Sequence, residues 1–114
     1  MRKIFSGKKL IFAMLLAFLF VDNVYADWSI RFIPNEASSV SVNINNESFM
    51  TWNSAEGDSS YVLPAKWLTL QKIHVYAAAS PKDKNATIQV IWNGKVCKEM
   101  KFDNDEDHDV STCN

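Results

Sequence analysis

Hydrophobic and polar residues alternate in several short stretches of the chain, which is the pattern of β-strands that bury one face and expose the other to water. In Ser39–Ile44, valine or isoleucine alternates with serine or asparagine. Trp28–Ile33 shows a similar alternation, and Pro34 ends it because proline has no N–H to donate to a sheet ladder. We therefore expect both stretches to be strands of an antiparallel sheet.

Two dipeptides predict tight hairpin turns. Asn45-Asn46 leads into a returning strand at Glu47–Trp52, and asparagine tolerates the positive φ angles of such a turn. Asn93-Gly94 is the stronger signal, and it joins strands predicted at Ala86–Trp92 and Lys95–Phe102. Two-residue turns would place three pairs opposite each other: Val42 and Phe49, Val90 and Cys97, Ile91 and Val96.

The segment between these hairpins is less regular. Asn53–Ser60 is predicted to be a polar loop, Tyr61–Leu63 a short strand, and Pro64–Trp67 a corner or a turn of helix. Thr69–Ser80 is the longest predicted strand, because β-branched and aromatic residues precede its three alanines. Its alternation changes phase near Gln71-Lys72, which predicts a β-bulge at that point.

These stretches, with a last short strand at Val110–Cys113, give seven or eight strands and almost no helix. Many short strands separated by polar turns are typical of an all-β fold, either a sandwich or a small barrel. We expect a small antiparallel β-sandwich that forms one domain over residues 27–114, a length that suits a single small core. No internal repeat or linker divides this region.

The first 26 residues have a different composition. Basic residues come first, at Arg2, Lys3, Lys8 and Lys9. The apolar run Leu10–Val21 follows, and the small-residue pattern Val24-Tyr25-Ala26 comes after it. This order is typical of a secretory signal peptide, so we expect cleavage after Ala26 and a secreted or periplasmic protein. The alternative is a membrane anchor, but the run is shorter than the roughly 20 residues that a spanning helix needs.

Removal of the signal peptide changes the charge of the chain. The whole chain has 12 basic and 13 acidic residues. The signal peptide contains four of the basic residues and one acid, Asp22, so 8 basic and 12 acidic residues remain, a net charge of −4. Binding to nucleic acid or to anionic lipid requires a surplus of lysine and arginine. We therefore expect neither nucleic acid nor a membrane as a partner of the mature domain.

The chain has 2 cysteines, Cys97 and Cys113. In an exported protein an even number of cysteines predicts a disulfide. This bridge would close a loop of about 15 residues, which in the chain-entropy model stabilises the fold by about 3 kcal/mol. The alternative is a metal site of Cys97, His108 and Cys113, which lacks the paired Cys-x-x-Cys ligands of structural zinc sites. We expect the disulfide.

Acidic residues are concentrated shortly before the last cysteine. Four of them alternate along the chain: Asp103, Asp105, Asp107 and Asp109. An extended chain would place these carboxylates on one side, and Ca²⁺ prefers such oxygen ligands. The helix–loop–helix calcium motif is excluded, because its sixth position needs glycine and this segment has His108 there. We expect a solvated loop without a cofactor; the alternative is a Ca²⁺ site to which Glu56 and Asp58 would add oxygens.

Aromatic residues flank the polar loop at Asn53–Ser60. Trp52 and Trp67 lie on its two sides in the sequence, and Tyr61 follows it. Tryptophan suits both protein cores and contact surfaces. Trp52, Tyr61 and Trp67 are therefore the candidate binding residues. The simpler interpretation, which we favour, is that the tryptophans cap the core at one end of the sandwich.

No catalytic motif is present: the sequence has no G-x-S-x-G elbow, no H-E-x-x-H pair and no phosphate-binding loop. Ser59 follows a turn, but nothing in the sequence brings His74 or His108 to it as a base. We therefore expect a non-enzymatic binding protein that recognises a protein partner, as an inhibitor or a secreted effector does. The alternative is a calcium-dependent glycan-binding module that uses the acidic segment and a tryptophan.

Overall fold

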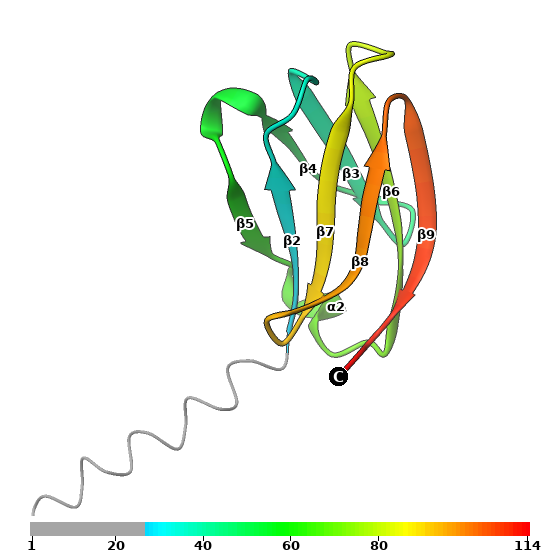
Figure 1. Cartoon of the computed structure of the whole chain (residues 1–114). Coiled ribbons are helices and arrows are strands. Elements are labelled where there is room, and N and C mark those ends of the chain that lie inside the picture. The colour runs from blue at the N-terminus through cyan, green and yellow to red at the C-terminus, as the bar shows by residue number, and fades with distance from the viewer. Residues whose placement is uncertain (1–26) are drawn as a thin grey trace, which may run out of the picture.

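The computed structural model describes residues 27–114; the predicted signal peptide lies outside the described residues. In the described part, eight strands form two four-stranded antiparallel sheets that pack face to face (Figure 1). The predicted all-β sandwich is therefore confirmed. Within the same residues, no helix combines the length and the apolar character needed to cross a membrane.

Each sheet has two edge strands. Sheet 1 has the order β5-β2-β7-β8, and its strands are β2 (Trp28–Ile33), β5 (Ser59–Val62), β7 (Ala86–Trp92) and β8 (Lys95–Phe102). Sheet 2 has the order β4-β3-β6-β9, and its strands are β3 (Ser39–Ile44), β4 (Glu47–Asn53), β6 (Lys72–Ser80) and β9 (Asp105–Ser111). The 3₁₀-helix η1 (Ser54–Glu56) leads from β4 to β5, and α2 (Ala65–Leu68) leads from β5 to β6. Edges β4 and β5 lie on one side of the sandwich, and β8 and β9 lie on the other (Figure 1).

The core lies between the sheets and consists of the alternate residues that the sequence pattern predicted. Trp28, Ile30 and Phe32 of β2 are fully buried. The ring of Phe32 stacks on Trp52 of the opposite sheet, with 5.5 Å between the ring centroids. Full burial of an apolar side chain of this size stabilises the fold by about 1.5–3 kcal/mol. The alternation along each strand therefore determines which sheet face enters the core.

The buried indole rings also have their N–H groups satisfied. Nε1 of Trp28 donates to the carbonyl oxygen of Leu70 at 2.9 Å. Nε1 of Trp52 donates to the carbonyl oxygen of Gly57 at 3.1 Å. A buried polar group without a partner would cost about 1–3 kcal/mol. These hydrogen bonds remove that cost and allow both tryptophans to lie inside.

The hairpin between β3 and β4 is confirmed, but its predicted register is wrong. Asn45 and Asn46 both have positive φ, as a two-residue turn of this kind requires. Val42 pairs with Met50 rather than with the predicted Phe49. The register shifts between Val42 and Asn43, so that β4 has one extra residue in the ladder.

The hairpin between β7 and β8 shows the same effect. Its turn, Asn93-Gly94, has positive φ at both residues, and Ile91 faces Val96 as predicted. Val90, however, pairs with Lys98 rather than with the predicted Cys97, because the register shifts between Val90 and Ile91. Cys97 is therefore the extra residue of β8.

Strand β6 begins at Lys72, three residues later than the predicted Thr69. The residues before it, up to Leu68, form α2 instead. From Lys72 to Ala78 the ladder with β9 is continuous, so the bulge predicted near Gln71-Lys72 is wrong. The alanines at the end of the segment are part of the strand, as predicted.

The acidic segment forms a strand from Asp105 onwards, so the predicted loop is wrong, although Asp107 and Asp109 are exposed to solvent as predicted. Strand β9 pairs with β6 along its whole length, from Asp105 opposite Ala78 to Ser111 opposite Lys72. The last strand therefore begins at Asp105 rather than at Val110. The physical reason is that the main-chain groups on this side of β6 need partners, and β9 supplies them.

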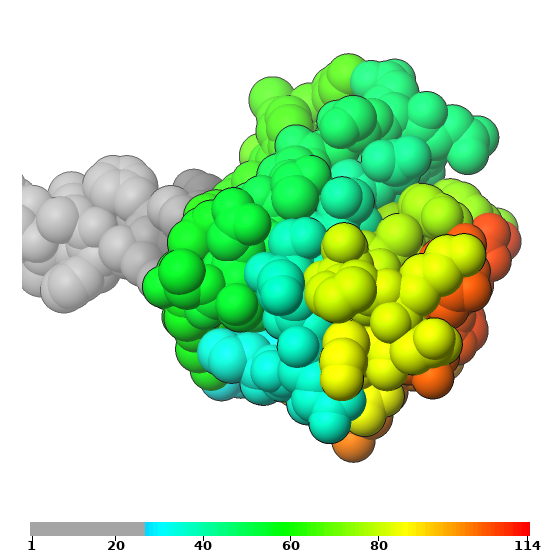
Figure 2. All heavy atoms as spheres, turned by 90° about the horizontal axis from the view of Figure 1, so that it is seen from above, coloured from blue at the N-terminus to red at the C-terminus, as the bar shows by residue number. Residues whose placement is uncertain are grey.

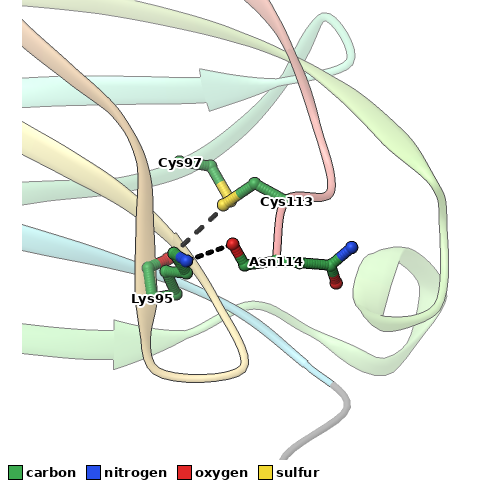
Figure 3. The surroundings of a disulfide bond; sticks show 4 residues. All are labelled: Lys95, Cys97, Cys113 and Asn114. Carbon is green, nitrogen blue, oxygen red and sulfur yellow. Dashed lines mark hydrogen bonds between the residues drawn. A yellow bond between two sulfur atoms is a disulfide. The ribbon is translucent and has the colours of Figure 1, made fainter.

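Cys97 and Cys113 form the predicted disulfide (Figure 3). The bridge joins β8, an edge of sheet 1, to the residues that follow β9, an edge of sheet 2. Beside it, the Lys95 ammonium donates to the carbonyl oxygen of Asn114 (Figure 3). The two sheets are thus covalently connected at one end of the β8/β9 side.

We expect the double variant Cys97→Ser with Cys113→Ser to lower the free energy of unfolding. The two cysteines are 16 residues apart, and in the chain-entropy model such a loop contributes about 3 kcal/mol. For a domain of this size that loss lowers Tm by roughly 10 °C or more. Urea denaturation of the double variant and the oxidised wild type measures the difference. Reductant should reproduce the loss in the wild type; an equal free energy of unfolding in all three samples would contradict the prediction.

Candidate functional site

The structure buries two of the three predicted binding residues. Trp52 is 1% exposed and Trp67 is 5% exposed. Tyr61 is half-buried, and its ring meets that of Phe32 edge-on with 5.9 Å between centroids. The alternative in which Trp52 and Trp67 form an exposed recognition surface does not hold, because both rings pack in the hydrophobic core. The simpler interpretation, in which the tryptophans belong to the core, is confirmed.

The polar loop before β5 has its own partners. Arg31 of β2 binds Asp58 with two hydrogen bonds, at 2.8 and 2.7 Å, and these lower the pKa of the Asp58 carboxyl. Glu56 accepts a hydrogen bond from the hydroxyl of Tyr61. These residues lie near β5, and β5 and β9 are edges on opposite sides of the sandwich. Glu56 and Asp58 therefore do not add oxygens to the acidic segment.

Five outward-facing side chains of β6 and β9 form a surface that we call the acidic face: His74, Tyr76, Asp105, Asp107 and Asp109. His74 lies opposite Asp109, and Tyr76 lies opposite Asp107. Successive side chains of a strand point to opposite faces, so the three aspartates share the outer face, as their alternation predicted. The sequence pattern did not connect His74 and Tyr76 with these aspartates. It does indicate that both side chains face outward, because they alternate with the apolar Ile73 and Val75.

The side chains of the acidic face hydrogen-bond across the two strands. His74 binds Asp109 through Nδ1 at 2.8 Å and Asp107 through Nε2 at 3.1 Å. The hydroxyl of Tyr76 donates to Asp105 at 2.9 Å. Each of these bonds uses one oxygen of its carboxylate. The aspartates are therefore fixed in place by β6, and their other oxygens are available to a partner.

The electrostatics of the acidic face follow from these contacts. The hydrogen bond to Asp109 raises the pKa of His74, and Asp107 raises it further. The same bond from His74 lowers the pKa of Asp109, an effect to which Lys72 adds. The carboxylate of Asp105 raises the pKa of Tyr76, because ionised tyrosine could not donate to it. The contacts within the acidic face therefore favour the charged forms of both His74 and Asp109.

The inward side of β9 is also charged. Glu106 and His108 pair with the buried Ala77 and Val75 of β6, so they point toward the gap between the sheets. Nε2 of His108 lies 3.1 Å from Oε2 of Glu106. Inward-pointing charges on an edge strand disfavour the addition of strands that offer these charges no partner. His108 therefore has a structural contact and lies on the other side of the strand from the acidic face.

The geometry gives the calcium alternative no support. Within residues 27–114, no group of three or more His, Cys, Asp or Glu side chains is placed to hold a metal ion. Alternate residues of a strand are about 6.5–7 Å apart. Asp107 and Asp109 each bind a different ring nitrogen of His74, so their carboxylates do not surround a position where a metal ion could sit. Asp103 lies apart, in the turn before β9. A Ca²⁺ site thus remains a prediction from the sequence alone.

Ser59 and the two histidines belong to different sheets. Ser59 is on β5 of sheet 1, and its hydroxyl donates to the carbonyl oxygen of Gly57 at 2.8 Å. His74 is on β6 and His108 is on β9, both in sheet 2. A serine and a base must be within hydrogen-bonding reach to act together. The structure does not bring these residues together.

The hollows on the described surface include two that are lined largely by polar side chains. One, of about 450 Å³, is lined by Tyr76, Asp105, Glu106, Asp107 and His108. The other, of about 530 Å³, lies at the end of the sandwich seen in Figure 2, where segments near residues 35 (cyan) and 85 (yellow) meet. Its lining is mixed, with amide, hydroxyl, ammonium and carboxylate groups from Asn35, Asn85, Thr87, Lys101 and Asp103. The first hollow lies along the strand that carries the acidic face.

Comparison with known proteins found no matching family model, no matching curated protein and no matching solved structure.

We expect Ca²⁺ to leave the stability of residues 27–114 unchanged, because the aspartates do not converge on one point. Thermal melts in EDTA and in excess CaCl₂ test this. A ligand at about 100 times its Kd would add about 2.7 kcal/mol and raise Tm by several degrees. A rise that disappears in Asp105→Asn with Asp107→Asn would instead establish the calcium site.

We expect the stability of the protein to fall as the pH rises from about 6 to about 8, and His74→Gln to reduce this dependence. The pKa of His74 is raised above its ordinary value of 6.5 in the folded state. His74 therefore contributes fully to the stability of the fold below its ordinary pKa, and this stabilisation is lost as the pH rises through the raised pKa of the folded state. The lowered pKa of Asp109 acts in the acid range, where stability is lost as the pH falls.

Urea denaturation at several pH values measures this effect. His108→Gln is the matched control, because it removes the other histidine and leaves the acidic face intact. The slope of its stability against pH is compared with the slopes of His74→Gln and of the wild type. The same slope of stability against pH in His74→Gln and wild type would show that His74 does not contribute.

Proposed function

We propose that the mature chain is a small exported protein that acts by binding a protein partner rather than by catalysis, as an inhibitor or a secreted effector does. Its contact surface is the acidic face. Export is supported by the signal-peptide pattern in the sequence and by the disulfide, which suits an oxidising compartment. The location is therefore the periplasm or the outside of the cell.

The observation that carries the proposal is the row of three aspartates on β9. Asp105, Asp107 and Asp109 lie on one side of a single strand, and each is hydrogen-bonded to β6. Side chains that are already fixed lose little freedom when a partner binds, so less binding energy is lost to ordering them. The acidic face is thus preorganised for binding in the unbound protein.

The charge of this surface defines the class of partner. The three carboxylates outnumber the one histidine that binds two of them, so the acidic face attracts a positively charged partner. Charge complementarity of this kind raises the association rate and excludes partners of the wrong charge. The partner is therefore a protein with a basic segment, rich in lysine or arginine, at its contact site.

A short peptide with lysine at every second position and uncharged residues between is the probe for this proposal. We expect isothermal titration calorimetry to detect binding at low salt that weakens as salt is added, because exposed ion pairs are screened. Asp105→Asn with Asp107→Asn removes two ion pairs worth up to about 1 kcal/mol each, so it should weaken binding by about twofold to about 30-fold.

The matched control is Asp27→Asn with Asp83→Asn, which changes the net charge equally but lies outside the acidic face. We expect this control to bind the peptide nearly as well as the wild type does. Equal weakening by the two double variants would mean that net charge alone attracts the peptide. Equal binding of a peptide without lysine would also contradict the proposal.

A further inference from the structure

Strand β9 is the last strand of sheet 2, with β6 on one side (Figure 1). On its other side, no further strand of the described chain pairs with it. An edge strand of this kind exposes main-chain N–H and C=O groups that an added strand can bind. Only every second residue of β9 directs these groups outward, because their direction alternates along an antiparallel strand.

Two main-chain hydrogen bonds at the ends of β9 identify the residues whose main-chain groups face β6. The N–H of Ala79 donates to the carbonyl of Asn104 at 2.7 Å, and the N–H of Thr112 donates to the carbonyl of Gln71 at 2.9 Å. The even-numbered residues therefore face β6. In an antiparallel ladder the direction of these groups alternates from residue to residue. Asp105, Asp107 and Asp109 consequently direct their N–H and C=O groups to the open edge.

The opposite side of β6 agrees with this assignment. His74 lies opposite Asp109, and its carbonyl accepts a hydrogen bond of 2.8 Å from the N–H of Asn45, next to β3. His74 therefore directs its main-chain groups away from β9. It forms a non-hydrogen-bonded pair with Asp109, and side chains lie closer together in such pairs. This explains why the histidine and the aspartate meet across the strands.

The three aspartates of the acidic face thus combine two kinds of binding group. Each presents a carboxylate on the outer face and unpaired main-chain groups at the edge. In an antiparallel pair, residues directly opposite place their side chains on the same face, and opposite charges there are favourable. The complementary ligand is an extended segment with lysine or arginine at every second position.

We propose that such a segment of the partner adds to sheet 2 as an antiparallel strand beside β9. Its cationic side chains then lie opposite Asp105, Asp107 and Asp109. This inference rests on the proposed function, because it describes how the basic partner binds the acidic face.

The hollow along β9 supports this mode of binding. It is lined by residues from both faces of the strand, and it contains Glu106. Oε1 of Glu106 is buried and has no hydrogen-bond partner among the described residues. Buried acceptors usually have a donor. The intervening residues of an added strand point to the same side as Glu106, so a serine or threonine among them supplies that donor.

A second copy of this chain does not fit the edge. If two copies paired through β9, aspartate would lie opposite aspartate, which is destabilising. Strand β8 of another copy is also unsuitable, because its outward residues include Glu99 between Lys101 and Val96 rather than a row of cations. The charge pattern therefore selects a different chain, one with cations at every second position.

The test compares three peptides that have the same charge. The first has lysine at every second position; the second carries N-methyl groups on the lysine amides; the third carries them on the intervening amides. In an antiparallel complex the lysine N–H groups point at β9, and the intervening N–H groups point to solvent. We expect the first and third peptides to bind the mature protein, and the second to bind at least tenfold more weakly.

Amide hydrogen exchange in the complex gives a second measurement. We expect the first peptide to protect the amides of Asp105, Asp107 and Asp109 from exchange, and those of Glu106 and His108 to change little. Equal binding of all three peptides without this protection would overturn strand addition and leave charge recognition by the acidic face intact. Weaker binding of only the third peptide would overturn the antiparallel direction. A failure of every peptide to bind at low salt would overturn the proposed function itself.

Discussion

Packing of the two sheets against each other is the constraint on which the rest of the structure depends. The stacked rings of Phe32 and Trp52, only 9° from parallel, are the clearest contact between the layers. Because every second side chain must enter this core, the groups available for function lie on outer faces, at edges and in turns. A sandwich of two four-stranded sheets also has four edge strands, and each must satisfy or protect its main-chain groups.

Local signals in the sequence were enough to predict the fold class, the two tight hairpins and the disulfide. The registers were not predictable in the same way. Phe49 and Cys97 are each the extra residue of a hairpin, and an extra residue leaves the turn signal unchanged while it moves every later pair. The pairing of Trp52 with Val40, which places both in the core, depends on this shift and could not be read from the turn alone.

The acidic strand shows a different limit of sequence interpretation. Apart from Val110, β9 has no apolar residue, so nothing in its own composition favours a strand. It becomes one because β6, about thirty residues earlier, has main-chain groups that need partners, and because His74 and Tyr76 bind its aspartates. The alternation of the acids predicted correctly that they share a side. The histidine and tyrosine beside them could be found only once the pairing of β6 with β9 was known.

The disulfide has a mechanical consequence for this edge. Cys97 and Cys113 close a covalent ring that contains most of β8, the turn and all of β9. A force that pulls on the residue after Cys113 is shared between the main chain of β9 and the disulfide, which carries part of it to β8. The ring therefore lowers the force that pulls β9 away from β6, because a load applied after Cys113 is divided between the two sheets.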